Sequence, residues 1–258
     1  MKPKMHFIPE YIQNPIEPIT VLLIGAGGNG SQMLSALARM DAALVQLNHP
    51  GLVVTVYDSD RVEETNIGRQ LFTQNDLGQN KAVALVTRFN RIYGTNWNAV
   101  PKLFAPNKNN LYGKNIIITC VDKVAVRKTL GDVFRKIKSN SSAPEHETYY
   151  WLDLGNGQRT GQAILGSTKT RQPKSKEYEP FGTLPTVCEL FDLSEQDETD
   201  SGPSCSLAEA LSKQDLFINS SLVQCAASLL WSVLTDAGID IHGFFLNLDT
   251  YKMNPIKI

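Results

Sequence analysis

The four cysteines of this 258-residue chain are too widely spaced to form a metal-binding motif. They lie at positions 120, 188, 205 and 225, with no CxxC pair and no His/Cys cluster. We therefore expect no zinc site, and free thiols in a reducing compartment.

The chain also lacks an excess of charge and a long apolar run. Lys and Arg total 25 against 26 Asp and Glu, a net charge of -1, which gives no electrostatic reason to expect a nucleic-acid partner. Neither the first nine residues nor any later run predicts a signal peptide or a membrane span. We therefore expect a cytoplasmic protein that does not associate with a membrane. Its length predicts one domain over residues 1–258.

The most informative stretch is a glycine-rich turn between an apolar run and a helical pattern. Residues 21–24 are Val-Leu-Leu-Ile, and Gly25-Ala26-Gly27-Gly28-Asn29-Gly30 follows. This order predicts strand, tight turn and helix, with phosphate on the free N–H groups of the helix. The candidate nucleotide-binding residues of the turn are Gly25, Gly27, Gly28 and Gly30. Alone, the turn fits any Rossmann protein.

The residues that follow narrow the prediction to a nucleotide whose phosphates react. The run 52–57 ends at Asp58, the usual place of a carboxylate that binds ribose, and further polar residues come after it: Asp60, Asn66, Arg69, Gln70 and Lys81. Cleavage of ATP needs such cations because charge must be neutralised on phosphorus and on the departing pyrophosphate. Hydride transfer does not need them.

These motifs, together with Asp122 after an apolar strand, resemble the adenylating domain shared by ThiF, MoeB and the ubiquitin-activating enzymes. The order and spacing agree over roughly the first half of the chain. Within that superfamily the chain is most similar to the ThiF-type protein of the plasmid-associated PRTRC gene cluster.

The resemblance implies ATP-dependent adenylation of the C-terminal carboxylate of a small ubiquitin-like protein, by a homodimer. It implies that Asp58 binds ribose, that Arg69 and Lys81 bind phosphates, and that Asn66 and Gln70 position the nucleotide. Asp122 would bind Mg²⁺. Asp60 is a further nucleotide-binding candidate, although a carboxylate in a turn often caps a helix.

The family often places an N-terminal arginine in the partner subunit's ATP site. No arginine precedes Arg39 here. Three possibilities stay open: Lys2 or Lys4 replaces this arginine, an arginine from elsewhere in the chain replaces it, or the contact with the partner subunit is missing.

The pattern predicts an α/β fold: a Rossmann-like mixed sheet, parallel in the N-terminal half, with antiparallel strands added in the C-terminal half and helices on both faces. Residues 1–18, with four prolines, predict an irregular arm. Further expected elements are strands at 98–104, 116–121, 149–155, 161–166 and 244–248, helices at 30–47, 81–93, 207–211 and 217–234, and a short tail at 249–258.

Residues 167–204 show no regular pattern, and a stretch of this length is usually functional or mobile. The resemblance implies a crossover loop over the adenylate and the substrate tail. Cys205 would then accept the activated carboxylate, with its pKa lowered at a helix N-terminus. A buried thiol is an equal alternative. Cys188 is the second candidate nucleophile, and Cys120 and Cys225 belong in the core.

Three alternatives stay open. Arg127 either closes over the nucleotide or pairs with a carboxylate. An NAD-dependent oxidoreductase would share the first βαβ unit but leave Arg69 and Lys81 unexplained. A catalytically silent nucleotide-binding scaffold is favoured by the missing N-terminal arginine.

Overall fold

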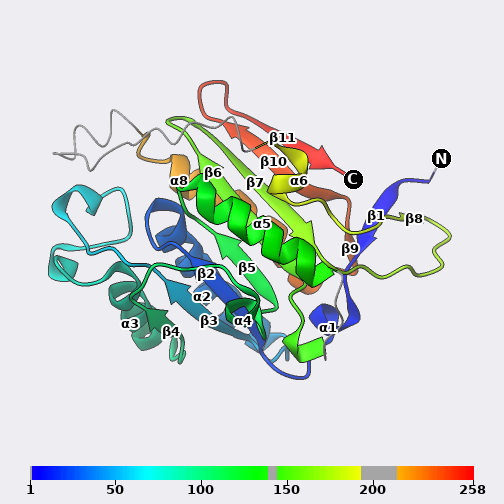
Figure 1. The fold of residues 1–258 in the computed structure, drawn as a ribbon, viewed down its shortest axis with the longest axis horizontal. Helices are drawn as coiled ribbons and strands as arrows, with labels where there is room; N and C mark the ends of the chain where they lie inside the picture. Colours follow the sequence, from blue (N-terminus) through cyan, green and yellow to red (C-terminus); the bar gives the residue numbers. More distant parts are fainter. Residues whose placement is uncertain (1, 139–143, 193–213) are drawn as a thin grey trace.

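An eight-stranded mixed sheet forms the centre of the fold (Figure 1). The protein is seen here as a computed structural model, which describes residues 2–138, 144–192 and 214–258. The strands of the sheet are, in chain order, β2 (Ile19–Ile24), β3 (Leu52–Tyr57), β4 (Asn98–Val100), β5 (Ile116–Thr119), β6 (Tyr150–Asn156), β7 (Thr160–Ser167), β10 (Ile241–Asn247) and β11 (Lys252–Lys257). Their order across the sheet is β11-β10-β7-β6-β5-β2-β3-β4.

The sheet changes from parallel to antiparallel at β6, which confirms the prediction. The pairs β3·β4, β2·β3, β2·β5 and β5·β6 are parallel. The pairs β6·β7, β7·β10 and β10·β11 are antiparallel. The chain leaves β2 toward β3 on one side and later enters β5 on the other, so the strand order reverses beside β2. In open α/β sheets ligands bind at such a switch point, outside the carboxyl ends of the strands.

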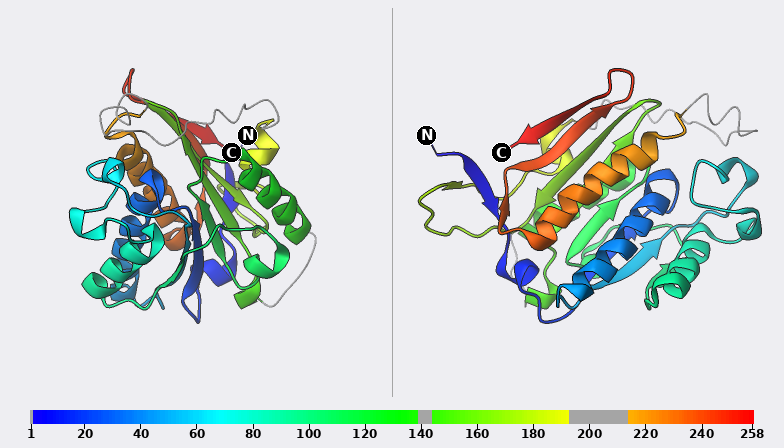
Figure 2. Two further views of the ribbon diagram at one scale, coloured as in Figure 1. Left: turned by 60° about the vertical axis from the view of Figure 1, so that its left-hand side comes forward. Right: turned by 180° about the vertical axis from the view of Figure 1, so that it is seen from behind.

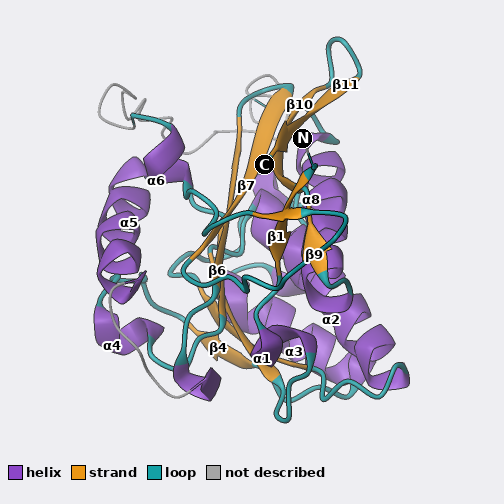
Figure 3. Cartoon of the chain, turned by 90° about the vertical axis from the view of Figure 1, so that its right-hand side faces the viewer, coloured by secondary structure: helices purple, strands orange, loops and turns teal. Residues whose placement is uncertain are grey.

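Helices cover both faces of the sheet, as predicted (Figure 3). One face carries α2 (Gly28–Gln46), α3 (Lys81–Tyr93) and α8 (Ile218–Thr235), and the other carries α4 (Lys108–Leu111), α5 (Val124–Lys138) and α6 (Val187–Leu190). Asn80 caps α3 by accepting the Val83 N–H at 3.1 Å, and Gly94 ends it at φ 70°. The predicted helix at 207–211 lies outside the described residues.

The prediction of an irregular N-terminal arm is wrong. Strand β1 (Lys4–Phe7) pairs with β8 (Glu179–Pro180) and β9 (Gly238–Ile239), and α1 (Glu10–Gln13) follows. Ile8 and Ile12 are fully buried. The elements are four residues long, which is too short for a periodic pattern, so the prolines dominated the sequence signal.

The C-terminal tail is also not a tail, because β11 forms the edge of the sheet. Most of its residues are exposed, and the sequence Lys-Met-Asn-Pro-Ile-Lys therefore has no apolar alternation. Pro255 is tolerated since an edge strand leaves N–H groups unpaired. Within 167–204, the described part contains β8 and α6, and residues 193–204 lie outside it.

Helix α8 is long and apolar enough, by length and composition alone, to be a candidate membrane span, with a mean hydropathy of 1.2. The sequence analysis expected no such run. Nine of its residues are buried in this fold, where it packs against α2 and the sheet. A core helix passes the same test.

Two isoleucines four residues apart test the corrected N-terminus. Ile12 is fully buried and Ile16 is 91% exposed. We expect Ile12→Ala to lower the free energy of unfolding by about 3 kcal/mol, because it leaves a cavity, and Ile16→Ala to change it by less than about 0.5 kcal/mol. Urea unfolding measures both. Equal effects would mean that the N-terminal segment does not pack as described.

His6 attaches β1 to the main sheet. Its Nε2 accepts the hydroxyl of Tyr150 at 2.9 Å, and its Nδ1 donates to the carbonyl of Gly182 at 3.0 Å. Burial lowers the pKa of His6 to about 4 from 6.5, against the bond to Gly182, which raises it. The folded protein therefore holds this imidazole neutral.

In the unfolded chain His6 is protonated below about pH 6.5. In the folded protein it is protonated only below about pH 4. Stability from this group is complete above pH 6.5 and falls by about 3 kcal/mol as the pH drops to 4. We expect His6→Phe to remove that part of the slope, measured by urea unfolding at a series of pH values. Identical slopes in the two proteins would contradict this environment.

Candidate nucleotide site

The glycine turn joins β2 to α2 in a conformation that side chains would prevent. Gly25 has φ +92°, and a Cβ there would lie 2.5 Å from the Cys120 carbonyl oxygen. A Cβ on Gly30 would lie 1.9 Å from the Gly25 carbonyl oxygen. Helix α2 begins at Gly28, and no side chain caps it. Its first N–H groups are therefore open to an anion.

Asp58 follows β3 and holds the turn. Its Oδ2 accepts the Ala26 N–H at 2.6 Å, and its Oδ1 accepts the Asp60 N–H at 2.8 Å. Burial raises the pKa of Asp58, and these two hydrogen bonds oppose the shift. The carboxylate thus lies between the strand end and the glycine turn, where a ribose would be bound.

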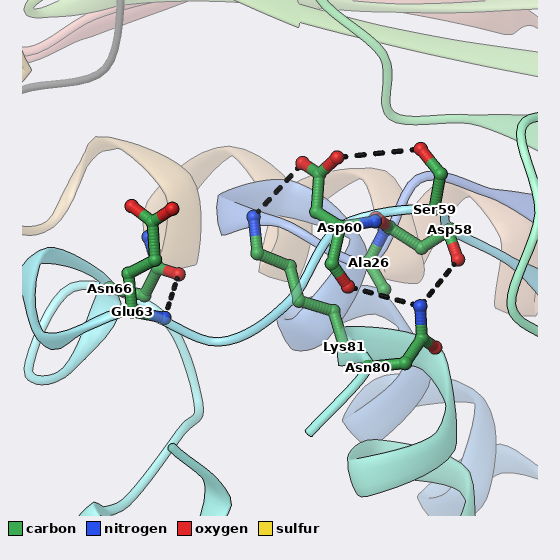
Figure 4. A network of polar contacts seen from close by, with 8 residues as sticks. All are labelled: Ala26, Asp58, Ser59, Asp60, Glu63, Asn66, Asn80 and Lys81. Atoms are coloured by element: carbon green, nitrogen blue, oxygen red, sulfur yellow. Dashed lines mark hydrogen bonds and ion pairs between the residues drawn. The ribbon is translucent and has the colours of Figure 1, made fainter. Parts of the chain in front are cut away.

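Lys81 reaches the same region from the first turn of α3 (Figure 4). It is 8% exposed, and its Nζ lies 3.2 Å from Asp60 Oδ2. The amide of Asn80 donates to the carbonyls of Asp58 and Asp60, so it ties the start of α3 to the loop after β3. Asp60 therefore pairs with Lys81, whereas Asp58 accepts the Ala26 N–H of the glycine turn.

The loop between β3 and α3 contains two short 3₁₀ helices, η1 (Glu64–Asn66) and η2 (Gln74–Asp76). Asn66 is buried, and its Oδ1 accepts the Glu63 N–H at 3.0 Å, so this side chain stabilises the loop. Gln70 is also buried, and its Oε1 has no hydrogen-bond partner within the described residues. The family resemblance implies that both amides position the nucleotide, and Asn66 has this structural role in the loop as well.

Arg69 is half withdrawn from solvent beside Asp122. Burial lowers the pKa of Arg69, and the charge of Asp122 raises it in part. The Nη1 donates to the amide oxygen of Gln214, whereas Nε is buried and finds no partner in the part of the chain that the structure describes. The charge of Asp122 therefore acts on Arg69.

Asp122 is exposed just beyond the carboxyl end of β5. No group of three or more His, Cys, Asp or Glu side chains that could hold a metal occurs within the described residues. Mg²⁺ is commonly held by one or two carboxylates together with substrate phosphates. A single carboxylate at this edge fits that mode of binding and does not fit an all-protein metal cage.

Of the two readings of Arg127, the structure supports the ion pair. Its Nε lies 2.8 Å from Asp153 Oδ1, and its Nη2 donates to the Leu154 carbonyl at 2.9 Å. Burial would lower the pKa of Arg127, but the charge and hydrogen bond of Asp153 raise it overall. The pair joins α5 to β6 beneath the Asp122 turn.

The described cysteines have the surroundings of packed thiols. Burial raises the pKa of Cys188 to about 11, with a contribution from Asp153, and its Sγ donates to the Arg127 carbonyl at 3.4 Å. Burial also raises the pKa of Cys120 and Cys225. Cys188 would therefore be a poor nucleophile. Cys205 lies outside the described residues.

Both N-terminal lysines are engaged by their own chain. Lys2 Nζ donates to the Ser175 carbonyl at 3.0 Å, and Lys4 Nζ lies 5.8 Å from the centre of the Phe181 ring.

Sequence reasoning missed three asparagines around the glycine turn. Asn29 Nδ2 donates to Asn156 Oδ1 at 2.8 Å, and the Asn219 amide occupies the space that a Cβ on Gly28 would fill. Asn29 lies within the motif and could have been suspected. Asn219 has no local signal, because only the packing of α8 on α2 brings it here.

The sequence pattern of the ThiF family matches residues 2–257 of this chain. The chain belongs to the ThiF family.

Individual relatives agree with this family. The chain is 32% identical over 123 residues to the ATP-dependent ubiquitin transferase-like protein Cap2 of Enterobacter hormaechei subsp. hoffmannii (strain UCI 50), which covers 45% of this chain and 19% of Cap2. It is similar to the crystal structure of PaaA, with a TM-score of 0.60 and 15% identity over 93% of this chain and 64% of that one. It is also similar to the crystal structure of E. coli MccB with ATP, with a TM-score of 0.58 and 13% identity over 95% of this chain and 65% of that one.

These structural likenesses show the fold of this ThiF-family chain. A structure of MccB with N-formylated MccA gives the same result, with a TM-score of 0.59 and 14% identity over 95% of this chain and 66% of that one. The chain spans less than two thirds of the length of each of these proteins, and about a fifth of Cap2.

The buried pair beneath the site gives a stability prediction. Asp153→Ala leaves Arg127 as an unpaired buried charge, so we expect the free energy of unfolding to fall by about 3 to 5 kcal/mol. The exposed pair of Asp132 and Arg135, also on α5, is the control. Asp132→Ala should change stability by less than about 1 kcal/mol. Chemical denaturation measures both, and a small loss for Asp153→Ala would contradict the buried pair.

Proposed function

We propose that this protein adenylates the C-terminal carboxylate of a small ubiquitin-like protein, with ATP as the second substrate. The observation that supports it most is the position of Lys81: a buried cation paired with Asp60, whose charge also acts on Asp58. Binding a ribose and a phosphate does not require a buried lysine at this place. Stabilising the charge that develops on a reacting phosphate does require a cation.

In this proposal Asp58 accepts hydrogen bonds from the ribose hydroxyls, and the N–H groups of the glycine turn bind the phosphates. Lys81 leaves Asp60 to offset charge at the α-phosphate, while Arg69 offsets charge on the departing pyrophosphate. A carboxylate oxygen of the substrate attacks the α-phosphorus as the bond to the β-phosphate oxygen breaks. The products are an acyl adenylate and pyrophosphate, and positioning and electrostatics supply the catalysis.

Mg²⁺ would be held by Asp122 together with substrate phosphates, and when bound it would neutralise part of their charge. The exposure of Asp122 at the strand end and its influence on Arg69 support this assignment.

The proposed substrate class draws on the relatives. Cap2 is described as ubiquitin transferase-like, and MccB is seen in complex with N-formylated MccA. The first description supports a ubiquitin-like protein as the substrate class. We further propose a PRTRC-type ThiF protein, active as a homodimer in the cytoplasm, whose Cys205 takes the acyl group from the adenylate by displacing AMP.

Two other functions make different predictions. An NAD-dependent oxidoreductase leaves Lys81 and Arg69 without a role. A silent nucleotide-binding scaffold is favoured by one observation, the absence of an arginine before Arg39. Such a protein would bind ATP without turnover.

ATP–pyrophosphate exchange tests the proposal directly. The purified protein is assayed with and without ubiquitin-like proteins from the same gene neighbourhood. We expect exchange only with a partner, and a loss of about 100- to 1000-fold in Asp122→Ala, because the carboxylate that would hold Mg²⁺ beside the transferring phosphate is removed.

Asp132→Ala is the matched control, since Asp132 is an exposed carboxylate of the neighbouring helix. It should retain full exchange. Measurable ATP binding without exchange for any partner would favour the scaffold, and equal losses in the two variants would remove the role of Asp122.

A further inference from the structure

A neutral side chain holds Arg69, whereas a carboxylate holds Lys81. The Nη1 of Arg69 donates to the amide oxygen of Gln214, and no carboxylate of the described residues forms an ion pair with this arginine. Lys81 Nζ lies 3.2 Å from Asp60 Oδ2. Most other arginines of the described chain also pair with carboxylates, namely Arg88, Arg127, Arg135, Arg159 and Arg171. The partner of Arg69 is therefore unusual for a cation of this protein.

Gln214 precedes α8, and the contacts of the next residue fix its place. Asp215 Oδ2 lies 2.7 Å from Arg159 Nη1, and the Asp215 N–H donates to the Gln158 carbonyl at 2.9 Å. Both partners belong to the turn between β6 and β7. The start of α8 lies beside the loop between β3 and α3, which carries Arg69, in both views of Figure 2. The β6–β7 turn therefore places Gln214 at Arg69.

The contact leaves most of the guanidinium available to a ligand. An arginine carries five N–H donors, one on Nε and the others on Nη1 and Nη2. Gln214 takes one donor of Nη1, and Nε is buried without a partner among the described residues. Nη2 likewise has no acceptor in the described part of the chain. The free donors of Nη1 and Nη2 suffice for a bidentate contact with phosphate oxygens.

The neutral partner also preserves the charge of Arg69. Burial lowers the pKa of Arg69, so its charged form is already costly, and the charge of Asp122 compensates only in part. A carboxylate in place of the amide would hold the side chain, but it would cancel the positive charge at short range. An amide oxygen fixes the planar guanidinium, so less rotamer freedom is lost when an anion binds.

We propose that Gln214 is a positioning residue for Arg69: its amide oxygen fixes the guanidinium in the orientation that binds the phosphates of the nucleotide. This rests on the proposed function, in which Arg69 offsets charge on the departing pyrophosphate. Gln214 acts on nucleotide affinity only through Arg69. Because the β6–β7 turn fixes Gln214, the antiparallel half of the sheet contributes to a site that the parallel half builds.

Calorimetric titration of the full chain with ATP, and with adenosine as the reference, tests the proposal. Gln214→Met keeps the length of the side chain and removes the amide. We expect ATP to bind about 3- to 10-fold more weakly, because the hydrogen bond that orients Arg69 is lost, and adenosine to bind with unchanged affinity. In an Arg69→Ala background, Gln214→Met should have no further effect on ATP affinity, since the two residues act as one unit.

Gln224→Met is the matched control. Gln224 of α8 also accepts a hydrogen bond from an arginine, Arg39 Nη2 of α2 at 2.9 Å, and both side chains are exposed. This variant should bind both ligands like the unmodified protein. Tighter ATP binding by Gln214→Met would overturn the proposal, because Gln214 would then compete with phosphate. An equal loss of adenosine affinity, or the same loss of ATP affinity without Arg69, would reduce Gln214 to a structural residue.

Gln214→Glu separates the charge of the partner from its fit. It keeps an acceptor at the same place, so we expect a melting temperature, followed by circular dichroism, at least as high as that of the unmodified protein. ATP should bind about 10-fold or more weakly, because a carboxylate pairs with Arg69 and cancels its charge. Unchanged ATP affinity in Gln214→Glu would also overturn the proposal.

Pyrophosphate exchange on the same preparations separates this inference from the proposed function. Exchange with unchanged kcat and unchanged KM for ATP in Gln214→Met would remove the positioning role and leave adenylation standing. The expected ATP affinities without exchange for any partner would retain the role of Gln214 and remove adenylation.

Discussion

The hydrogen bond from the Ala26 N–H to Asp58 is the contact on which the rest of the site depends. It joins the turn after β2 to the end of β3 across 2.6 Å, and both strands are buried and paired in register. Asp58 thereby fixes the turn from outside. The start of α2 needs no capping side chain of its own and stays available to an anion.

The same arrangement explains why the cations gather where they do. Asn80 ties the loop after β3 to the start of α3, so the first residue of that helix, Lys81, lies beside Asp60. Arg69 comes from the same loop, and Asp122 from the end of the neighbouring strand β5. The loop therefore supplies one member of each of two charged pairs, Lys81 with Asp60 and Arg69 with Asp122.

The sequence predicted the central βαβ units, since long buried strands and amphipathic helices have strong periodic patterns. It also predicted the change to antiparallel strands after β6. It missed β1, α1 and β11, because two of them are only four residues long and the third is an exposed edge strand.

The candidate site divides in the same way. Gly25, Asp58 and Lys81 lie in local motifs, so the sequence alone could propose them, whereas Asn219 has no local signal because only tertiary packing brings it to the turn. The pairing of Arg127 with Asp153 could be offered only as one of two alternatives, since side-chain partners 26 residues apart leave no pattern in one sequence. The ThiF-family match covers residues 2–257 as a whole and supports the fold.

Nucleotide affinity of Asp58→Asn, measured by calorimetry, tests the account most directly, because the substitution keeps the shape of the side chain and removes its charge. We predict that ATP, AMP and adenosine all bind about 10- to 100-fold more weakly, since each loses a hydrogen bond to a charged group. Unchanged affinity for all three would contradict the placement of the nucleotide at this turn.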